Sequence, residues 1–198
     1  MRSWLVLAGL LVSSPALAAE VGEPAPDFSL TDLSGKAVKL SDLRGHVVVL
    51  EWFNPGCPFV KASHTRGTLV GAAVRHVKDG VVWLAVNSAA PGKQGYGAEA
   101  NRAAVQEFRM GYPVLLDPSG KVGRAYGATN TPGMFVIDRE GRLAYRGAID
   151  NSPDGERQAP QGGALIDYVS SALEDLAAGR PVRTPETKQY GCSVKYGS

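Results

Sequence analysis

The order of the sequence patterns predicts an α/β protein with a central mixed β-sheet that helices cover on both faces. Two continuous apolar runs, residues 47–50 and 81–86, have the length and composition of strands that are buried on both sides. Amphipathic segments with helical spacing lie between the strands, so crossover connections and parallel strand pairs are expected. A hairpin near the end of this pattern, turning at Glu140-Gly141, adds antiparallel strands.

The first part of the chain is predicted to form a hairpin and a turn before the first buried strand. Two short runs alternate apolar and polar residues around the turn signal Ser34-Gly35, as expected of a small hairpin. A polar stretch that ends at Gly45 then forms a turn. These elements are expected at residues 27–30, 37–40, 41–45 and 47–51.

A long helix is predicted to follow the first buried strand. It begins at Pro58, because proline is favoured at the first helical position, and continues to about Val77. Gly67 weakens the middle of this helix, since glycine is a poor helix former. The residues that helical spacing places on its apolar face are Leu69, Val70, Ala73, Val74 and Val77.

The remaining elements alternate between strands and helices. A helix over residues 98–110 has Val105 and Phe108 on its inner face and ends at Gly111. The last helix ends before Gly179 and Pro181, and its apolar positions are Leu165, Val169, Leu173 and Leu176. The other predicted elements are strands at 81–86, 113–116, 134–137 and 143–146 and a short helix at 119–126.

The chain opens with the pattern of a secretory signal peptide. Arg2 precedes an apolar stretch over residues 4–12, and Ala16-Leu17-Ala18 matches a small-residue cleavage site. The stretch is too short to span a bilayer, so we expect cleavage near Ala18, a periplasmic location and no stable membrane anchor. An uncleaved anchor is the alternative. The expected parts are a signal peptide at 1–18, a domain at 19–179 and a C-terminal tail at 180–198.

The charge balance argues against a polyanionic partner. The chain has 21 Lys and Arg against 19 Asp and Glu, and removal of residues 1–18 takes away only the charge of Arg2. Basic residues form no cluster and do not alternate with aromatic residues, so neither nucleic acid nor a strongly acidic membrane surface is expected as a partner. Function is therefore expected from a local site.

Cys57 is the strongest candidate for that site, because it lies between the first buried strand and the long helix. With Pro58 at the first helical position, Cys57 stands at a helix N-terminus, where free N–H groups and the helix dipole stabilise a thiolate. The thiolate is the nucleophile of thiol chemistry. The other cysteine, Cys192, is near the end of the chain, so the two can pair only through tertiary proximity.

Several segments resemble the redoxin (AhpC/TSA-related) branch of the thioredoxin-like superfamily. The opening Gly-Glu-Pro-Ala-Pro-Asp-Phe at 22–28 and the stretch at 41–50 are similar to exported thiol oxidoreductases of that branch and to peroxiredoxin relatives. A lone Cys-Pro-Phe-Val at 57–60 and a C-terminal Gly-Cys-Ser at 191–193 resemble one bacterial subgroup. The resemblance implies a thioredoxin-like three-layer α/β/α sandwich with a central mixed β-sheet and an N-terminal β-hairpin extension.

The same resemblance implies roles for individual residues. Pro132 matches a cis-proline that lies against the reactive thiol, and the backbone of Thr131 matches the residue that pairs with a substrate peptide. Glu51, six residues before Cys57, matches the buried carboxylate that moves protons during exchange, although a solvated or salt-bridged glutamate is the alternative. The predicted substrate-binding residues are Thr131, Pro132, Trp52 and Pro58, with a core position as the alternative for Trp52.

Two departures from the family pattern narrow the chemistry. Val60 stands where a thioredoxin has its second cysteine, so another thiol must release a mixed disulfide formed at Cys57. Cys192 is the candidate, because an extended tail of that length reaches roughly 40 Å. Asn54 and Leu50 occupy the positions where peroxiredoxins have a hydroxyl residue and a proline, which disfavours reduction of hydroperoxides.

The predicted function is an exported thiol:disulfide oxidoreductase with Cys57 as nucleophile and Cys192 as resolving thiol. Lys61 could lower the thiol pKa, but a solvated lysine is favoured, and a copper site that includes His64 is disfavoured. No cofactor or metal is expected; the partners are protein or small-molecule thiols and disulfides and an external electron donor or acceptor. The alternatives are a degenerate thiol peroxidase and a non-catalytic module with a structural Cys57–Cys192 disulfide.

Overall fold

The computed structural model describes residues 18–152 and 154–198 and is built on one seven-stranded mixed sheet with the order β2-β1-β5-β4-β3-β7-β8. The interior strand β3 pairs in parallel with β4 and antiparallel with β7. These pairings confirm the predicted mixed sheet. The strands are β1 Ser29–Asp32, β2 Ala37–Lys39, β3 Val48–Trp52, β4 Val82–Asn87, β5 Val114–Leu116, β7 Gly133–Ile137 and β8 Leu143–Gly147.

The residues of β3 alternate between two hydrophobic cores, one on each face of the sheet. Val49 contributes to one core together with Cys57, whereas Val48, Leu50 and Trp52 contribute to the other. All five residues of β3 are buried, which is why the strand has a continuous apolar run rather than an alternating one.

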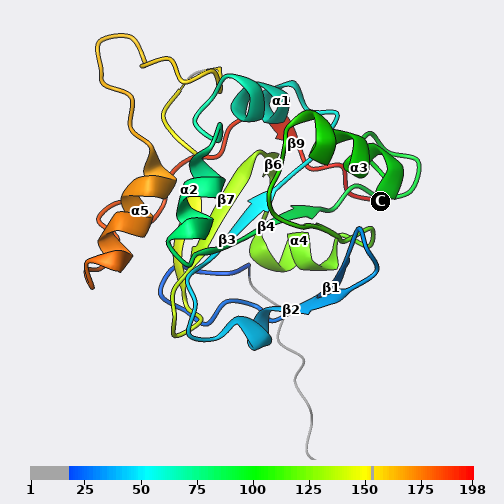
Figure 1. Ribbon diagram of the computed structural model, residues 1–198, viewed down its shortest axis with the longest axis horizontal. Helices are drawn as coiled ribbons and strands as arrows, with labels where there is room; N and C mark the ends of the chain where they lie inside the picture. The colour runs from blue at the N-terminus through cyan, green and yellow to red at the C-terminus, as the bar shows by residue number, and fades with distance from the viewer. Residues whose placement is uncertain (1–17, 153) are drawn as a thin grey trace, which may run out of the picture.

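Helices cover both faces of the sheet (Figure 1). Residues of α1, α2, α3 and α5 belong to the core that contains Cys57, and Tyr126 of α4 belongs to the opposite core. This arrangement is the expected three-layer α/β/α sandwich. The helices are α1 Pro58–Thr65, α2 Ala72–Lys78, α3 Ala98–Glu107, α4 Lys121–Tyr126 and α5 Tyr168–Ala177, with a short 3-10 helix, η1, over Leu40–Leu43.

The N-terminal hairpin extends the sheet, as expected. Strand β1 pairs antiparallel with both β2 and β5, so the hairpin adds two strands beside β5. The predicted signal peptide lies almost wholly outside the described residues. Ala19 is buried and donates its N–H to the carbonyl oxygen of Ala125. In the ranges 18–152 and 154–198, no helix is long and apolar enough to cross a membrane.

The prediction of one continuous helix over 58–77 is wrong, because the structure has two helices there, α1 and α2. A Cβ at Gly67 would overlap the carbonyl oxygen of Gly155, so a distant loop packs where a regular helix would need a side chain. The predicted apolar face is split by the break. Leu69 and Ala73 are buried, whereas Val70 and Val74 are exposed by 46% and 43%. Tertiary contact therefore overrides the helical pattern at this point.

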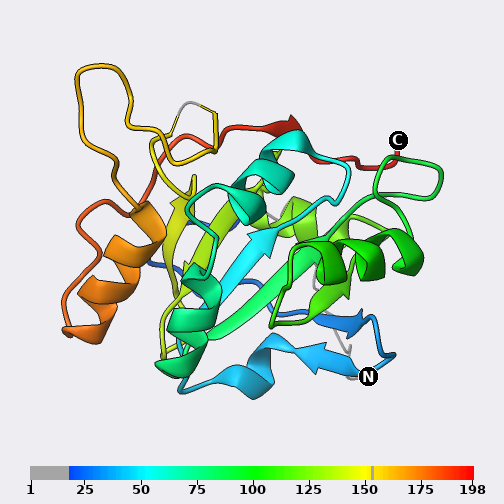
Figure 2. The ribbon, with the colours of Figure 1, turned by 45° about the horizontal axis from the view of Figure 1, so that its top comes forward.

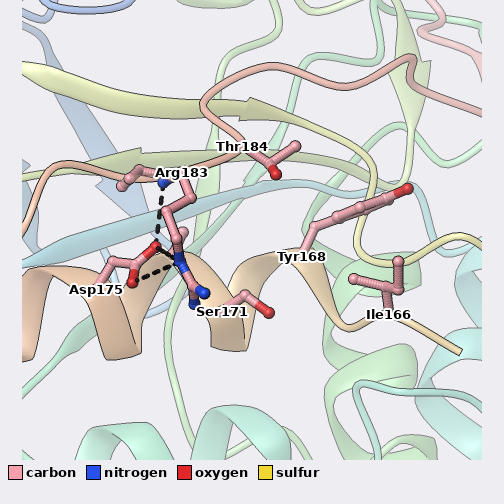
Figure 3. Close-up of a pocket in the computed structure, with 8 residues that line it drawn as sticks. Ile166, Tyr168, Ser171, Asp175, Arg183 and Thr184 are labelled. Atoms are coloured by element: carbon pink, nitrogen blue, oxygen red, sulfur yellow. Dashed lines mark hydrogen bonds and ion pairs between the residues drawn. The ribbon is translucent and has the colours of Figure 1, made fainter.

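The C-terminal tail crosses the molecule from α5 to the beginning of α1, as Figure 2 shows in orange to red. Its start is anchored to α5, where Asp175 accepts hydrogen bonds from the backbone and the guanidinium of Arg183 beside a small pocket (Figure 3). Farther along, Thr187 donates its N–H to the carbonyl oxygen of Arg146 on β8. The tail then forms a strand, β9 Cys192–Ser193, which pairs antiparallel with β6 Asn130–Thr131.

Candidate active site

Cys57 is the N-cap residue of α1, and Pro58 occupies the first turn, as the sequence predicts. The turn that presents Cys57 is held locally by Asn54, whose Oδ1 accepts from the N–H of Gly56 and whose backbone oxygen accepts from the N–H of Cys57. Lys61 donates its N–H to the carbonyl oxygen of Cys57 and so begins the helix. The sulfur therefore lies beside the unpaired N–H groups of a helix N-terminus.

The tail brings Cys192 to this sulfur. In the β6–β9 pair Cys192 lies directly opposite Thr131. This position brings Cys192 Sγ to 2.7 Å from Cys57 Sγ. Both cysteines are present as free thiols, and Cys57 Sγ also lies 3.1 Å from the carbonyl oxygen of Thr131. Only a short movement separates the two sulfurs from the disulfide bond length of about 2.05 Å.

The surroundings of the two thiols shift their pKa values in opposite directions. Burial opposes ionisation of Cys57, but hydrogen bonds from the Cys192 thiol, the Val60 N–H and the Thr131 hydroxyl lower the pKa of Cys57 overall. Burial and the neighbouring Cys57 sulfur raise the pKa of Cys192 to about 11. With both cysteines as thiols, the buried Thr131 hydroxyl has no hydrogen-bond partner among the described residues, and a Cys57 thiolate would provide the acceptor for it. The site thus favours a thiolate on Cys57 and a thiol on Cys192.

Alkylation of the reduced protein tests this asymmetry. Because only the thiolate reacts, the rate for Cys57 is expected to rise with pH at a midpoint below that of an ordinary cysteine, and the rate for Cys192 at about 11. In the variant Cys192→Ala, the Cys57 midpoint is expected to move upward, since alanine removes the thiol that donates to the Cys57 sulfur and ends the coupled titration. Peptide-resolved mass spectrometry after iodoacetamide pulses measures both profiles. Coincident midpoints would contradict the assignment.

The other predicted site residues divide into two groups. Thr131 and Pro132 are buried beside Cys57 and beneath the tail, and the peptide bond between them is cis. Pro58 is exposed at the start of α1. Trp52 is fully buried, with its Nε1 donating to Ser88 Oγ over 3.1 Å. This placement does not support a contact between Trp52 and a substrate, and it agrees with the alternative that the ring belongs to the core.

Glu51 is fully buried on the same face of β3 as the Cys57 core, not solvated. Its Oε1 lies 2.7 Å from His64 Nε2, and its Oε2 accepts from Tyr112 over 2.9 Å and from Trp83 over 3.4 Å. The hydrogen bond to Glu51 and the proximity of its charge, together with burial, raise the pKa of Tyr112 well above its ordinary value, burial being the largest cause. A buried carboxylate with three partners is a retained polar network, because burial without partners would be costly.

The sequence reasoning missed the partners of these residues. His64 faces Glu51 inside the core, whereas Lys61 on the same helix pairs at the surface with Glu107 over 2.7 Å. The described residues contain no group of three or more His, Cys, Asp or Glu side chains that could hold a metal. The loop before α3 also supports the site, since Gln94 donates to the carbonyl oxygen of Gly56. Spacing on α1 places His64 about two helical turns after Cys57, but it does not reveal that the partner of His64 is Glu51 on β3.

The fold and the site together define the class of the protein. A cysteine at the start of the first helix lies on a mixed sheet of this order and beside Thr131, shortly before the β7–β8 hairpin. This is the arrangement of a thioredoxin-like thiol oxidoreductase. The Redoxin family model matches residues 20–161. The chain therefore belongs to the Redoxin family.

Relatives with assigned names and solved structures agree with this class. The thiol-disulfide oxidoreductase ResA of Geobacillus thermodenitrificans is 34% identical over 127 residues, which cover 64% of this chain and 68% of that protein. A hypothetical protein from Sinorhizobium meliloti superposes with a TM-score of 0.77 at 28% identity, covering 92% of this chain and 97% of the other. An uncharacterized protein from Geobacillus kaustophilus gives 0.76 at 30% identity, covering 94% and 98%. The tail with Cys192 lies beyond the residues that the family model matches.

Proposed function

We propose that the protein exchanges disulfides with thiol substrates through a Cys57–Cys192 redox pair. Cys57 supplies the thiolate nucleophile, and Cys192 is the resolving thiol when a substrate disulfide is reduced. The observation that carries this proposal is the 2.7 Å approach of the two sulfur atoms across the β6–β9 pair. Proximity of this kind makes the second step intramolecular and therefore fast.

The reaction balances as a two-electron exchange. A Cys57 thiolate attacks one sulfur of a substrate disulfide, and the other substrate sulfur leaves as a thiolate. Deprotonated Cys192 then attacks the Cys57 sulfur of the mixed disulfide, which releases the second substrate thiolate and leaves the Cys57–Cys192 bridge. The substrate is reduced by two electrons and the pair is oxidised. The pair can also act in the other direction, in which the Cys57–Cys192 bridge accepts two electrons from a substrate dithiol.

Glu51 is proposed to hold and move a proton during these steps. It shares the Cys57 face of the sheet, and its three partners keep the carboxyl group at one position in the core. Thr131 and Pro132 are proposed to contact the substrate when the tail is displaced, and Pro58 to form part of the exposed surface beside the nucleophile.

The N-terminal pattern supports export to the periplasm. Ala19, the first residue after the proposed cleavage site, is already docked on the domain through Ala125 and accepts a hydrogen bond from Arg146 at its carbonyl oxygen. We propose a mature chain with a domain at 19–179 and a tail at 180–198. The N-terminal mass of protein recovered from a periplasmic fraction tests the cleavage. A mass that includes residues 1–18 would contradict it.

Titration of the bridge against glutathione tests the function. The expected result is a reversible Cys57–Cys192 disulfide that is reduced within the range of glutathione buffers, and loss of the bridge in both Cys57→Ser and Cys192→Ser. A bridge that resists reduction below about −300 mV would instead show a structural disulfide. Rapid loss of the Cys57 thiol with hydrogen peroxide, without exchange activity, would favour the peroxidase alternative. Absence of any bridge would overturn the redox pair.

A further inference from the structure

The two cysteine residues of the redox pair differ in their exposure to solvent. Cys57 has 0% of its surface exposed, because the core lies beneath it and the tail lies over it. Cys192 is only partly buried. A molecule arriving from solvent therefore meets Cys192 first as long as the tail stays docked. The rate of disulfide exchange depends on which sulfur can be reached, so this difference has a chemical consequence.

The tail is docked by contacts on both sides of Cys192. Before the cysteine, the carbonyl oxygen of Gly191 accepts a hydrogen bond of 3.0 Å from the side chain of Asn130. After it, Val194 donates its N–H to the carbonyl oxygen of Thr129 over 2.9 Å. Farther along, the Tyr196 hydroxyl donates to the carbonyl oxygen of Ala128 over 2.7 Å. These contacts fix the backbone around Cys192 as a strand, so the cover over Cys57 is a built part of the fold.

The far end of the tail has a second anchor. The guanidinium of Arg124 lies 4.6 Å from the centre of the Tyr196 ring and donates to the carbonyl oxygen of Gly197. The N–H of Ala90 also binds the tail through the carbonyl oxygen of Lys195. The segment that carries Cys192 is thus held at both ends over the active site.

The leaving group points to the same sulfur. When a thiolate attacks a disulfide, the sulfur that is not attacked departs as a thiolate, and a sulfur of lower pKa departs faster. Cys57 has the lowered pKa and the donors to hold the negative charge, whereas the pKa of Cys192 is raised to about 11. Attack on Cys192 therefore releases the Cys57 thiolate, which is the better leaving group. Attack on Cys57 would release the Cys192 thiolate, which is the poorer one.

We propose that, when the bridge acts as an oxidant, substrate thiolates attack Cys192 and not Cys57. This inference rests on the proposed function and assigns the substrate-facing sulfur of the same pair. A bond forms between the substrate sulfur and Cys192 Sγ, the Cys57–Cys192 bond breaks, and its electron pair leaves on Cys57. A second substrate thiolate then attacks the substrate sulfur of the mixed disulfide and releases Cys192. The substrate dithiol loses two electrons, and the protein pair gains them.

This assignment differs from the sequence-based prediction. That prediction has Cys57, at the helix N-terminus, form the bond to the substrate. Here the helix N-terminus holds the leaving thiolate, and the tail presents the electrophilic sulfur. The substrate class that fits is a thiol that can approach the exposed side of the tail without entering the core. A protein substrate does not have to displace the tail before the first bond forms.

Mapping the first mixed disulfide tests the inference. The oxidised wild-type protein is mixed with reduced glutathione, quenched with acid at successive short times, alkylated and digested. We expect glutathione on the peptide that contains Cys192 and the alkyl group on Cys57, with at least a tenfold excess over the opposite pattern. Glutathione mainly on Cys57 would overturn the inference while leaving the redox pair intact. A bridge that glutathione does not reduce would overturn the proposed function and this inference with it.

A variant with a loosened tail tests the structural cause. Tyr196→Ala removes the hydroxyl bond to Ala128 and the contact with Arg124 but leaves both cysteines in place. The excess of Cys192 adducts is expected to fall in this variant, because Cys57 becomes accessible. Tyr96→Ala, which removes a tyrosine that is 45% exposed and lies outside the tail, is the control and should keep the wild-type ratio. An unchanged ratio in Tyr196→Ala would show that docking of the tail does not select the attacked sulfur.

Discussion

Replacing Gly191 with alanine is expected to lower the effective concentration of Cys192 at Cys57 by at least about tenfold. Gly191 has a φ of +103°, and a Cβ there would overlap the carbonyl oxygen of Thr131. A non-glycine residue in such a conformation costs about 1 to 3 kcal/mol, and 1.4 kcal/mol corresponds to a factor of ten. The clash adds to this cost, because it forces the backbone of the tail away from Thr131. Thr131 is the residue that Cys192 pairs with in the β6–β9 ladder.

The measurement is the equilibrium between the bridge and a glutathione redox buffer, read by mass spectrometry. The matched control is Gly179→Ala. Gly179 also has a positive φ, +68°, but no atom lies within 4 Å of its Cβ position, and it precedes the tail. This control carries the backbone strain without the clash at the active site. Equal bridge stability in Gly191→Ala and wild type would contradict the role of the close approach.

The sequence predicts the position of Cys57 better than the path of the tail that brings Cys192 over it. The apolar run before Cys57 and the proline after it are local signals, and they place the sulfur at the N-cap of α1, where the structure has it. Strand β9 has only two residues, and its position depends on hydrogen bonds of Gly191 and Tyr196 to Asn130 and Ala128, which are 61 and 68 positions away in the chain. The sequence offers the cysteine and the length of the tail but no local pattern that specifies its path.

The break between α1 and α2 illustrates the same limit. Helical spacing runs through residues 69–77, but α1 ends at Thr65, and the carbonyl oxygen of Gly155 packs closely against Gly67 beyond that end. Likewise, Glu51 is recognisable by its distance from Cys57, but its pairing with His64 joins a strand to a helix. Periodicity reports which face of an element is apolar; it does not report which distant loop or side chain packs there.

Replacing His64 with alanine is expected to lower the free energy of unfolding by about 3 to 5 kcal/mol, the usual cost of removing one partner of a buried pair. The side chains of His64 and Glu51 are 4% and 0% exposed, so the contact that His64→Ala removes is a buried one. The variant also removes the stacking of the His64 ring on Phe108, with centroids 5.2 Å apart. Urea denaturation followed by far-ultraviolet circular dichroism measures the change.

Lys61→Ala is the matched control, because Lys61 lies on the same helix as His64. Its ion pair with Glu107 is more than half exposed at both side chains. Exposed pairs contribute about 0 to 1 kcal/mol, so the two variants separate burial from charge pairing. His64→Gln should recover part of the loss, since its amide can still donate to Glu51. If His64→Ala costs no more than Lys61→Ala, then Tyr112 and Trp83 alone satisfy the buried carboxyl group, and the His64 contact is dispensable for the core around Cys57.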